Sequence, residues 1–230
     1  MKLLPLFSLP LYTLAQVQQP AHFNPSNIGP LSVSFSGTGC PQGSVAASIS
    51  PSRDVVTLSF DRFAVYYGPG YSTAAKQRNC GVKFSFNVTG ETGWQFVPVE
   101  TTFHGYAALD KGVTAQMYAA FLDSYTEGVS STKVVLEGGK DLSAAGDVFT
   151  KSVNVVPWPP TIPTSRCVSG NMSYNMGTDV TMNLRVAVMS RNSTTTGSFF
   201  GEDESGERNI FTVQVRLLWK ECKNLGGFWG

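Results

Sequence analysis

Three segments of this chain alternate apolar and polar residues with a period of two, and this pattern constrains the fold most. In residues 82–88, 180–188 and 211–217, every second position is Val, Phe, Met or Leu, and the positions between them are mostly polar or charged. A period of two puts alternate side chains on opposite faces of a strand. The pattern therefore predicts half-buried antiparallel strands, each with one face toward a core and one toward solvent.

Further runs rich in β-branched and aromatic residues are also typical of strands. They are residues 31–35, 45–49, 55–67, 94–103, 133–136 and 148–156. Gly, Pro, Asn and Asp separate most of these runs, as expected of turns. We therefore expect an all-β fold, a single antiparallel β-sandwich of about ten strands with at most one short helix.

One segment is compatible with either a helix or a long strand. In residues 114–125, Met117, Phe121 and Tyr125 recur every four residues, and the alanines between them favour a helix. A long strand fits the same residues, and both interpretations stay open.

The amino terminus has the composition of a secretion signal. Lys2 supplies a positive charge, residues 3–14 are largely apolar, and Ala15 is a small residue at the expected cleavage point. No later apolar stretch is long enough to span a membrane, so we expect a secreted, extracellular protein. The expected division is a signal peptide (1–15), an extended leader (16–30), a β-sandwich domain (31–225) and a tail (226–230).

Four prolines lie within residues 157–163. Proline donates no backbone hydrogen bond, so this segment cannot form a central strand of a sheet. We expect it to connect strands within one sandwich, and a boundary between two domains is the alternative.

An even number of cysteines in an exported chain predicts disulfides. We expect Cys40 to pair with Cys80, and Cys167 with Cys222, because each pair then closes one half of the chain without crossing the other. Each bridge would stabilise the fold by roughly 4 kcal/mol in the chain-entropy model. A zinc site is disfavoured, because the four cysteines lack the close spacing that such sites use.

Three sequons for N-glycosylation agree with export, at Asn87, Asn171 and Asn192. Asn87 falls on the polar side of its predicted strand, where a glycan leaves the core undisturbed. We therefore expect a glycoprotein.

The charge of the chain disfavours nucleic acid as a partner. It has 17 Lys and Arg residues against 16 Asp and Glu residues, a net charge of +1, and no basic run that would follow a phosphate backbone. The two histidines have no metal-ligand partner nearby in sequence, so we expect no cofactor.

Four short motifs resemble a family of fungal secreted proteins known as domain of unknown function 4360. They are Gly37-Thr38-Gly39-Cys40-Pro41-Gln42-Gly43-Ser44, Tyr67-Gly68-Pro69-Gly70, Arg78-Asn79-Cys80 and the nine residues from Gly105 to Val113. The resemblance is strongest over residues 31–128 and weaker up to Cys222. It implies a small exported protein of filamentous fungi with cysteines, and it supplies no site residues.

Two groups of residues are candidates for a binding site. Tyr66, Tyr67 and Tyr71 flank Gly68-Pro69-Gly70, and rings on such a loop can stack against sugars or a partner surface, although alternate rings could instead fill the core. If processing occurred after Ala21, His22 would become the amino terminus and could bind copper with His104, which resembles the histidine brace of lytic polysaccharide monooxygenases.

These observations favour a non-catalytic extracellular protein that binds at the fungal cell wall or at a host or substrate surface. The alternative is a secreted enzyme acting on polysaccharide, through the copper site or through paired carboxylates, since a glycosidase needs two at a suitable separation.

Overall fold

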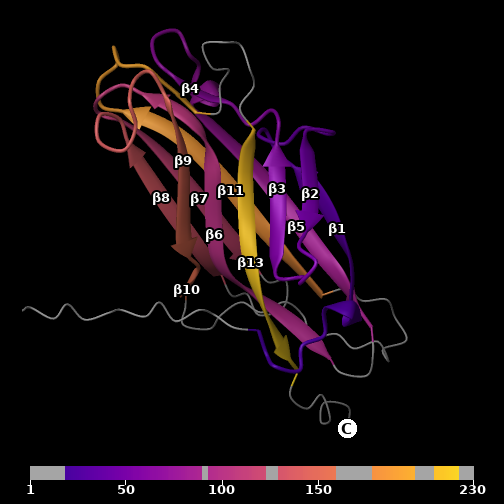
Figure 1. The fold of residues 1–230 in the computed structure, drawn as a ribbon. Coiled ribbons are helices and arrows are strands. Elements are labelled where there is room, and N and C mark those ends of the chain that lie inside the picture. Colours follow the sequence, from indigo (N-terminus) through magenta and orange to yellow (C-terminus); the bar gives the residue numbers. More distant parts are fainter. Residues whose placement is uncertain (1–18, 90–92, 123–128, 159–177, 200–209, 223–230) are drawn as a thin grey trace, which may run out of the picture.

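The computed structural model describes residues 19–89, 93–122, 129–158, 178–199 and 210–222. Within these ranges, antiparallel strands form two sheets that pack face to face as a β-sandwich (Figure 1). The predicted fold class is confirmed. The described ranges contain two short 3-10 helices, η1 (Pro25–Asn27) and η2 (Thr73–Lys76), and no helix long and apolar enough to cross a membrane.

Sheet A has the strand order β1-β5-β11-β7-β8-β10. Its strands are β1 (Ile28–Ser36), β5 (Gln77–Val88), β7 (Val113–Leu122), β8 (Val129–Glu137), β10 (Val156–Trp158) and β11 (Thr178–Ser190). Strand β10 lies at the edge of this sheet, and it contains Pro157. An edge position accommodates proline because the missing N–H removes no hydrogen bond from the sheet interior.

Sheet B has the strand order β2-β3-β13-β6-β12-β4, and β9 also pairs with β6. Its strands are β2 (Val45–Ile49), β3 (Val55–Phe60), β4 (Val65–Tyr67), β6 (Trp94–Leu109), β9 (Asp147–Asn154), β12 (Gly197–Phe199) and β13 (Phe211–Glu221). Strand β6 pairs with β13 over most of its length, and its last residues pair with β12. This places β12 and β4 at one end of the sandwich.

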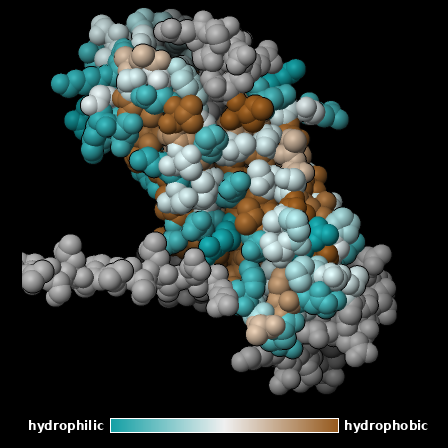
Figure 2. Space-filling view, in the orientation of Figure 1, coloured by the Kyte–Doolittle hydropathy of each residue, from teal (hydrophilic) through white to brown (hydrophobic). Residues whose placement is uncertain are grey.

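The core lies between the sheets and contains two groups of aromatic rings. One group surrounds Phe211, whose ring centroid lies 5.5 Å from that of Phe60 and 5.3 Å from that of Phe63. The other surrounds Trp219, 5.3 Å from Phe96. In Figure 2 the outer surface is mostly hydrophilic or neutral, and small groups of hydrophobic residues lie among the polar ones. The alternation in sequence thus separates a buried from a solvated face.

The segment that could have been a helix or a strand is a strand. Residues 113–122 form β7, which pairs with both β11 and β8. Its Ala115, Met117, Ala119 and Phe121 side chains are buried, every second residue in turn.

The expected extended leader is partly folded onto the sandwich. Strand β1 begins at Ile28, within the segment assigned to the leader. Further upstream, the Gln19 side chain donates to the carbonyl of Leu217 at 2.7 Å and accepts from the backbone N–H of Trp219 at 3.0 Å. Phe23 stacks on Trp219, with ring centroids 5.6 Å apart. The packed part of the chain therefore begins earlier than residue 31.

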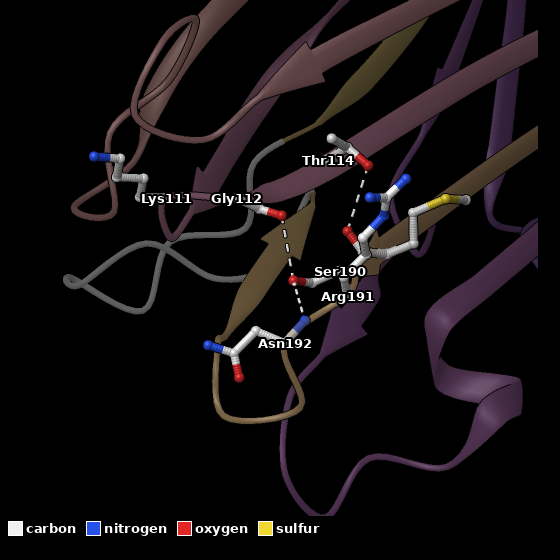
Figure 3. Close-up of a pocket in the computed structure, with 7 residues that line it drawn as sticks. Lys111, Gly112, Thr114, Ser190, Arg191 and Asn192 are labelled. Carbon is white, nitrogen blue, oxygen red and sulfur yellow. Dashed lines mark hydrogen bonds between the residues drawn. The ribbon is translucent and has the colours of Figure 1, made fainter.

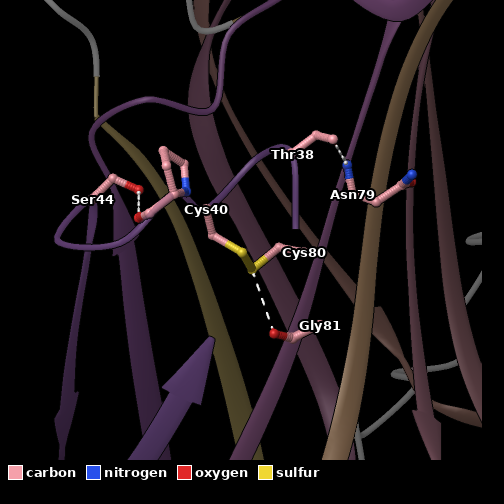
Figure 4. The surroundings of a disulfide bond; sticks show 7 residues. Thr38, Cys40, Ser44, Asn79, Cys80 and Gly81 are labelled. Atoms are coloured by element: carbon pink, nitrogen blue, oxygen red, sulfur yellow. Dashed lines mark hydrogen bonds between the residues drawn. A yellow bond between two sulfur atoms is a disulfide. The ribbon is translucent and has the colours of Figure 1, made fainter. Parts of the chain in front are cut away.

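A disulfide joins Cys40 and Cys80, one of the two pairings predicted from the sequence (Figure 4). Cys40 lies in the loop that leads from β1 in sheet A to β2 in sheet B, and Cys80 lies on β5. Gly37 has a φ of +147°, and a Cβ there would collide with the carbonyl oxygen of Asn79. The glycine and cysteine of this motif therefore hold the crossover loop against β5.

Candidate functional site

Several loops meet around strand β4 at one end of the sandwich (Figure 1). They enclose a cleft of about 290 Å³, which we call the tyrosine cleft. The residues that line it are Tyr66, Tyr67, Tyr71, Ala108, Asp110, Ala144, Thr196, Gly197 and Ser198. The volume is near the lower limit for small-molecule pockets.

Two of the predicted tyrosines form one wall of the cleft. The rings of Tyr66 and Tyr71 are stacked, with centroids 5.4 Å apart and planes inclined by 12°. The turn between them explains this arrangement: the Tyr71 N–H donates to the Gly68 carbonyl at 3.3 Å, Pro69 fixes its own φ, and Gly70 adopts a φ of +86°. Tyr71 remains 48% exposed, so the stacked pair faces solvent.

The third tyrosine, Tyr67, has a structural role as well as a place in the lining. Its hydroxyl donates to the carbonyl of Ser190 at 3.1 Å, at the end of β11. The Lys76 ammonium lies 4.8 Å from its ring centroid. Tyr67 therefore fixes the β11–β12 loop and η2 beside the cleft.

The floor and rim of the cleft are polar. Ser198 of β12 lies between Tyr66 of β4 and Ala108 of β6 in the sheet register. At the rim, the Asp110 carboxylate accepts from the backbone N–H of Thr196 at 2.7 Å and from its hydroxyl at 2.8 Å. These two hydrogen bonds lower the pKa of Asp110, because they favour the ionised carboxylate.

The Asp110 carboxylate is expected to stabilise the rim only above acidic pH. Since its folded-state pKa lies below the ordinary value of 3.8, its contribution is present above that value and is lost as the pH falls through the folded-state pKa. Asp110→Ala should lower the Tm at pH 7, and its difference from wild type should shrink as the pH falls below 3.8. Thermal melts across this range measure the difference, and a deficit that persists undiminished at low pH would contradict it. Asp61→Ala is the matched control, because the Asp61 side chain is exposed and accepts no hydrogen bond from a described residue.

The predicted glycosylation sites at Asn87 and Asn192 are both exposed. Asn87 lies on β5, and Asn192 lies in the β11–β12 loop beside a second hollow, which is shown in Figure 3. Asn171 lies outside the described residues, so attachment of a glycan at all three positions stays a prediction. Cys167 also lies outside them. Cys222 is disulfide-bonded, and its pairing with Cys167 stays a prediction.

The two histidines lie too far apart to bind one copper ion together, which corrects the pairing considered from the sequence. His22 contacts Glu221 at 2.8 Å, and its ring lies 5.6 Å from that of Trp94, at the start of β6. His104 lies ten residues further along this strand, about 30 Å away, where it contacts Thr150. Within the described ranges, no group of three or more His, Cys, Asp or Glu residues is arranged to hold a metal.

The structure thus defines a class, a disulfide-stabilised β-sandwich with an aromatic cleft at one end. Residues 27–222 match the family described as Domain of unknown function (DUF4360), and the chain belongs to this family. It is similar to an "Uncharacterized secreted protein" of the fungus Arthroderma benhamiae, with 26% identity over 201 residues, which cover 87% of this chain and 74% of the relative. The predicted family is confirmed, and the protein is secreted.

Two solved carbohydrate-binding modules are weakly similar to the chain. One is TmCBM61 in complex with β-1,4-galactotriose, with a TM-score of 0.24, 8% identity, and coverage of 83% of this chain and 88% of that one. The other is the family 11 module from Clostridium thermocellum in complex with a mixed-linked tetrasaccharide, with the same values. Likeness at these TM-scores supports no conclusion about the present site.

Proposed function

We propose that this secreted protein binds saccharides in the tyrosine cleft and acts by binding rather than by catalysis. The observation that carries the proposal is the stacked pair of Tyr66 and Tyr71, which presents aromatic surface to solvent at the edge of a polar cleft. Soluble proteins usually bury large aromatic rings, so a ring kept exposed by a specific turn is a candidate binding residue.

The chemistry of the cleft fits a sugar. A pyranose ring has an apolar face of C–H groups and an edge of hydroxyls, so it needs both an aromatic surface and hydrogen-bonding groups. The cleft supplies the first from Tyr71 and the second from Ser198 and Thr196. The turn and the bonds of Tyr67 hold these groups in place before binding, which reduces the entropy cost of association.

The location of the protein indicates where such sugars would be found. A secreted fungal protein meets the polysaccharides of its own cell wall and of the surfaces on which the fungus grows. We therefore propose wall or substrate polysaccharide as the partner of the tyrosine cleft.

Replacing Tyr71 with alanine tests this proposal. On a glycan array and in pull-downs with purified fungal wall fractions, wild type should be retained, and Tyr71→Ala should bind about five- to tenfold more weakly because the exposed ring is lost. Tyr71→Phe keeps the ring and is expected to bind within about twofold of wild type.

Two results would count against the proposal. One is absence of wild-type retention on every glycan and wall fraction, and the other is equal retention of the wild-type and Tyr71→Ala proteins. Melting temperatures measured in parallel separate lost binding from lost folding, and Tyr71→Ala should melt close to wild type because its side chain is half exposed.

A further inference from the structure

The outer face of sheet A carries two adjoining hollows along strands β7 and β11. The upper one, of about 550 Å³, is lined by Lys111, Gly112, Thr114, Met189, Ser190, Arg191 and Asn192 (Figure 3). The lower one, of about 270 Å³, is lined by Gln116, Tyr118, Lys133, Arg185 and Ala187.

The strand register places the two hollows side by side on adjoining rows of the sheet. Thr114 pairs with Met189, Gln116 pairs with Ala187, and Tyr118 pairs with Arg185, which are successive outward-facing rows of the sheet. From Thr114 to Tyr118 the strand extends about 14 Å. We call this surface the sheet A groove, and its length suits a linear chain of several sugar units.

Four basic side chains line the groove, and none of them forms an ion pair with a described residue. Lys111 and Arg191 lie at the upper hollow and flank Ser190 in Figure 3, and Lys133 and Arg185 lie at the lower one. All four are exposed. Arg185 has a neutral partner, since its guanidinium donates to the side-chain oxygen of Gln77 at 2.7 Å.

Carboxylates on this face are already paired with other lysines. Asp179 lies 2.9 Å from Lys83, and Glu137 lies 3.5 Å from Lys140. On the outer face of sheet B, by contrast, Arg216 lies directly opposite Glu100 in the register. The positive charge of the sheet A groove is therefore local, although the chain as a whole has a net charge of only +1.

An aromatic ring lies between two of the cations. Tyr118 pairs with Arg185 on one side and with Lys133 on the other, and it is 37% exposed. In the next row of the sheet, Ala187 pairs with Gln116. Because the Ala187 side chain is small, this row forms the floor of the lower hollow. A sugar ring that stacks on Tyr118 would place a carboxylate within reach of either cation.

We propose that the sheet A groove binds a linear anionic polysaccharide, one whose sugar units carry carboxylates. This goes beyond the tyrosine cleft, which lies at the end of the sandwich and has no lysine or arginine among its described lining residues. Charge complementarity selects an acidic chain, and secretion places the groove where such polymers occur.

Polygalacturonate is the test probe, and its methyl-esterified form is the neutral counterpart with the same backbone. By titration calorimetry at low salt, wild type should bind polygalacturonate and should bind the esterified polymer at least about tenfold more weakly. Binding should also weaken as NaCl is raised, because exposed charges are screened. The titrations use enzymatically deglycosylated wild-type protein, so that a glycan on Asn192 beside the groove does not enter the measurement.

Two double variants that remove the same charge from different sheets test whether polygalacturonate binds in the sheet A groove. Lys133→Gln with Arg185→Gln should weaken polygalacturonate binding about tenfold, while Lys151→Gln with Lys220→Gln, which removes the same charge from sheet B, should change it less than twofold. Tyr118→Ala should also weaken binding, and Tyr71→Ala should not.

The proposal is overturned by equal affinity for the charged and esterified polymers, or by equal losses in the two double variants. Tighter binding to single-stranded DNA of the same charge would overturn it as well, because the groove would then recognise phosphate rather than an acidic sugar. Retention of the wild-type Tm in each variant ensures that a loss of binding reports on the groove.

Discussion

Phe211→Ala is expected to lower the Tm of this protein by roughly 10 °C. Phe211 is fully buried, and its ring lies 5.5 Å from Phe60, 5.3 Å from Phe63 and 6.1 Å from Phe199. Truncation removes apolar surface and leaves a cavity in the buried core, which costs about 3–5 kcal/mol. Differential scanning calorimetry of the purified secreted protein measures the loss.

Phe211→Leu, a conservative replacement, tests whether the cavity causes the loss of Tm. Phe211→Leu fills most of the same space and is expected to lower the Tm by only a few degrees, about a third of the effect of Phe211→Ala. If Phe211→Ala melted within about 2 °C of wild type, the ring could not lie at the centre of the core.

Cys40→Ser is the other change with a large expected effect, a sharp fall in secreted yield. The Cys40–Cys80 bridge spans a sequence separation of 40 residues, and closing a loop of that size in the unfolded chain stabilises the native state by about 4 kcal/mol. Both cysteines are buried, so the variant also leaves an unpaired Cys80 thiol in the core. Secreted yield and Tm are the measurements.

The double variant Cys40→Ser with Cys80→Ser isolates the bridge from the loose thiol. It should restore part of the yield, because no reactive thiol remains to form wrong disulfides, but its Tm should stay well below wild type. Wild-type Tm in both variants would show that the bridge does not stabilise the fold.

The sequence predicted the class of fold because a period of two is visible wherever a strand is long. It failed to separate helix from strand in β7, since a spacing of four residues between Met117 and Phe121 fits one helical turn and is also twice the strand period. Strand β12 went unrecognised because three residues are too few to display any period. The neighbouring strands of the sheets determine both elements.

The candidate site was predictable only where its parts are close in sequence. Tyr66 and Tyr71 are separated by a turn that Pro69 and Gly70 signal directly. Asp110 and Thr196, which form the rim, are 86 residues apart, and no local pattern links them. The same holds for the sheet A groove, since Arg185 and Tyr118 become neighbours only through pairing of β11 with β7.

We expect the segment before β1 to limit self-association, because it covers part of the edge of β13. Strand β3 pairs with β13 as far as Arg216, and the Leu217 N–H donates to the Asp54 carbonyl. Without a further partner, the Leu217 carbonyl and the Trp219 N–H would be open to another extended chain. The amide of Gln19 occupies these groups at Leu217 and Trp219 and takes the place of a neighbouring strand. A strand edge without a partner is a template for aggregation. Removal of the first 21 residues would expose this edge, and the shortened protein is expected to aggregate more readily at high concentration.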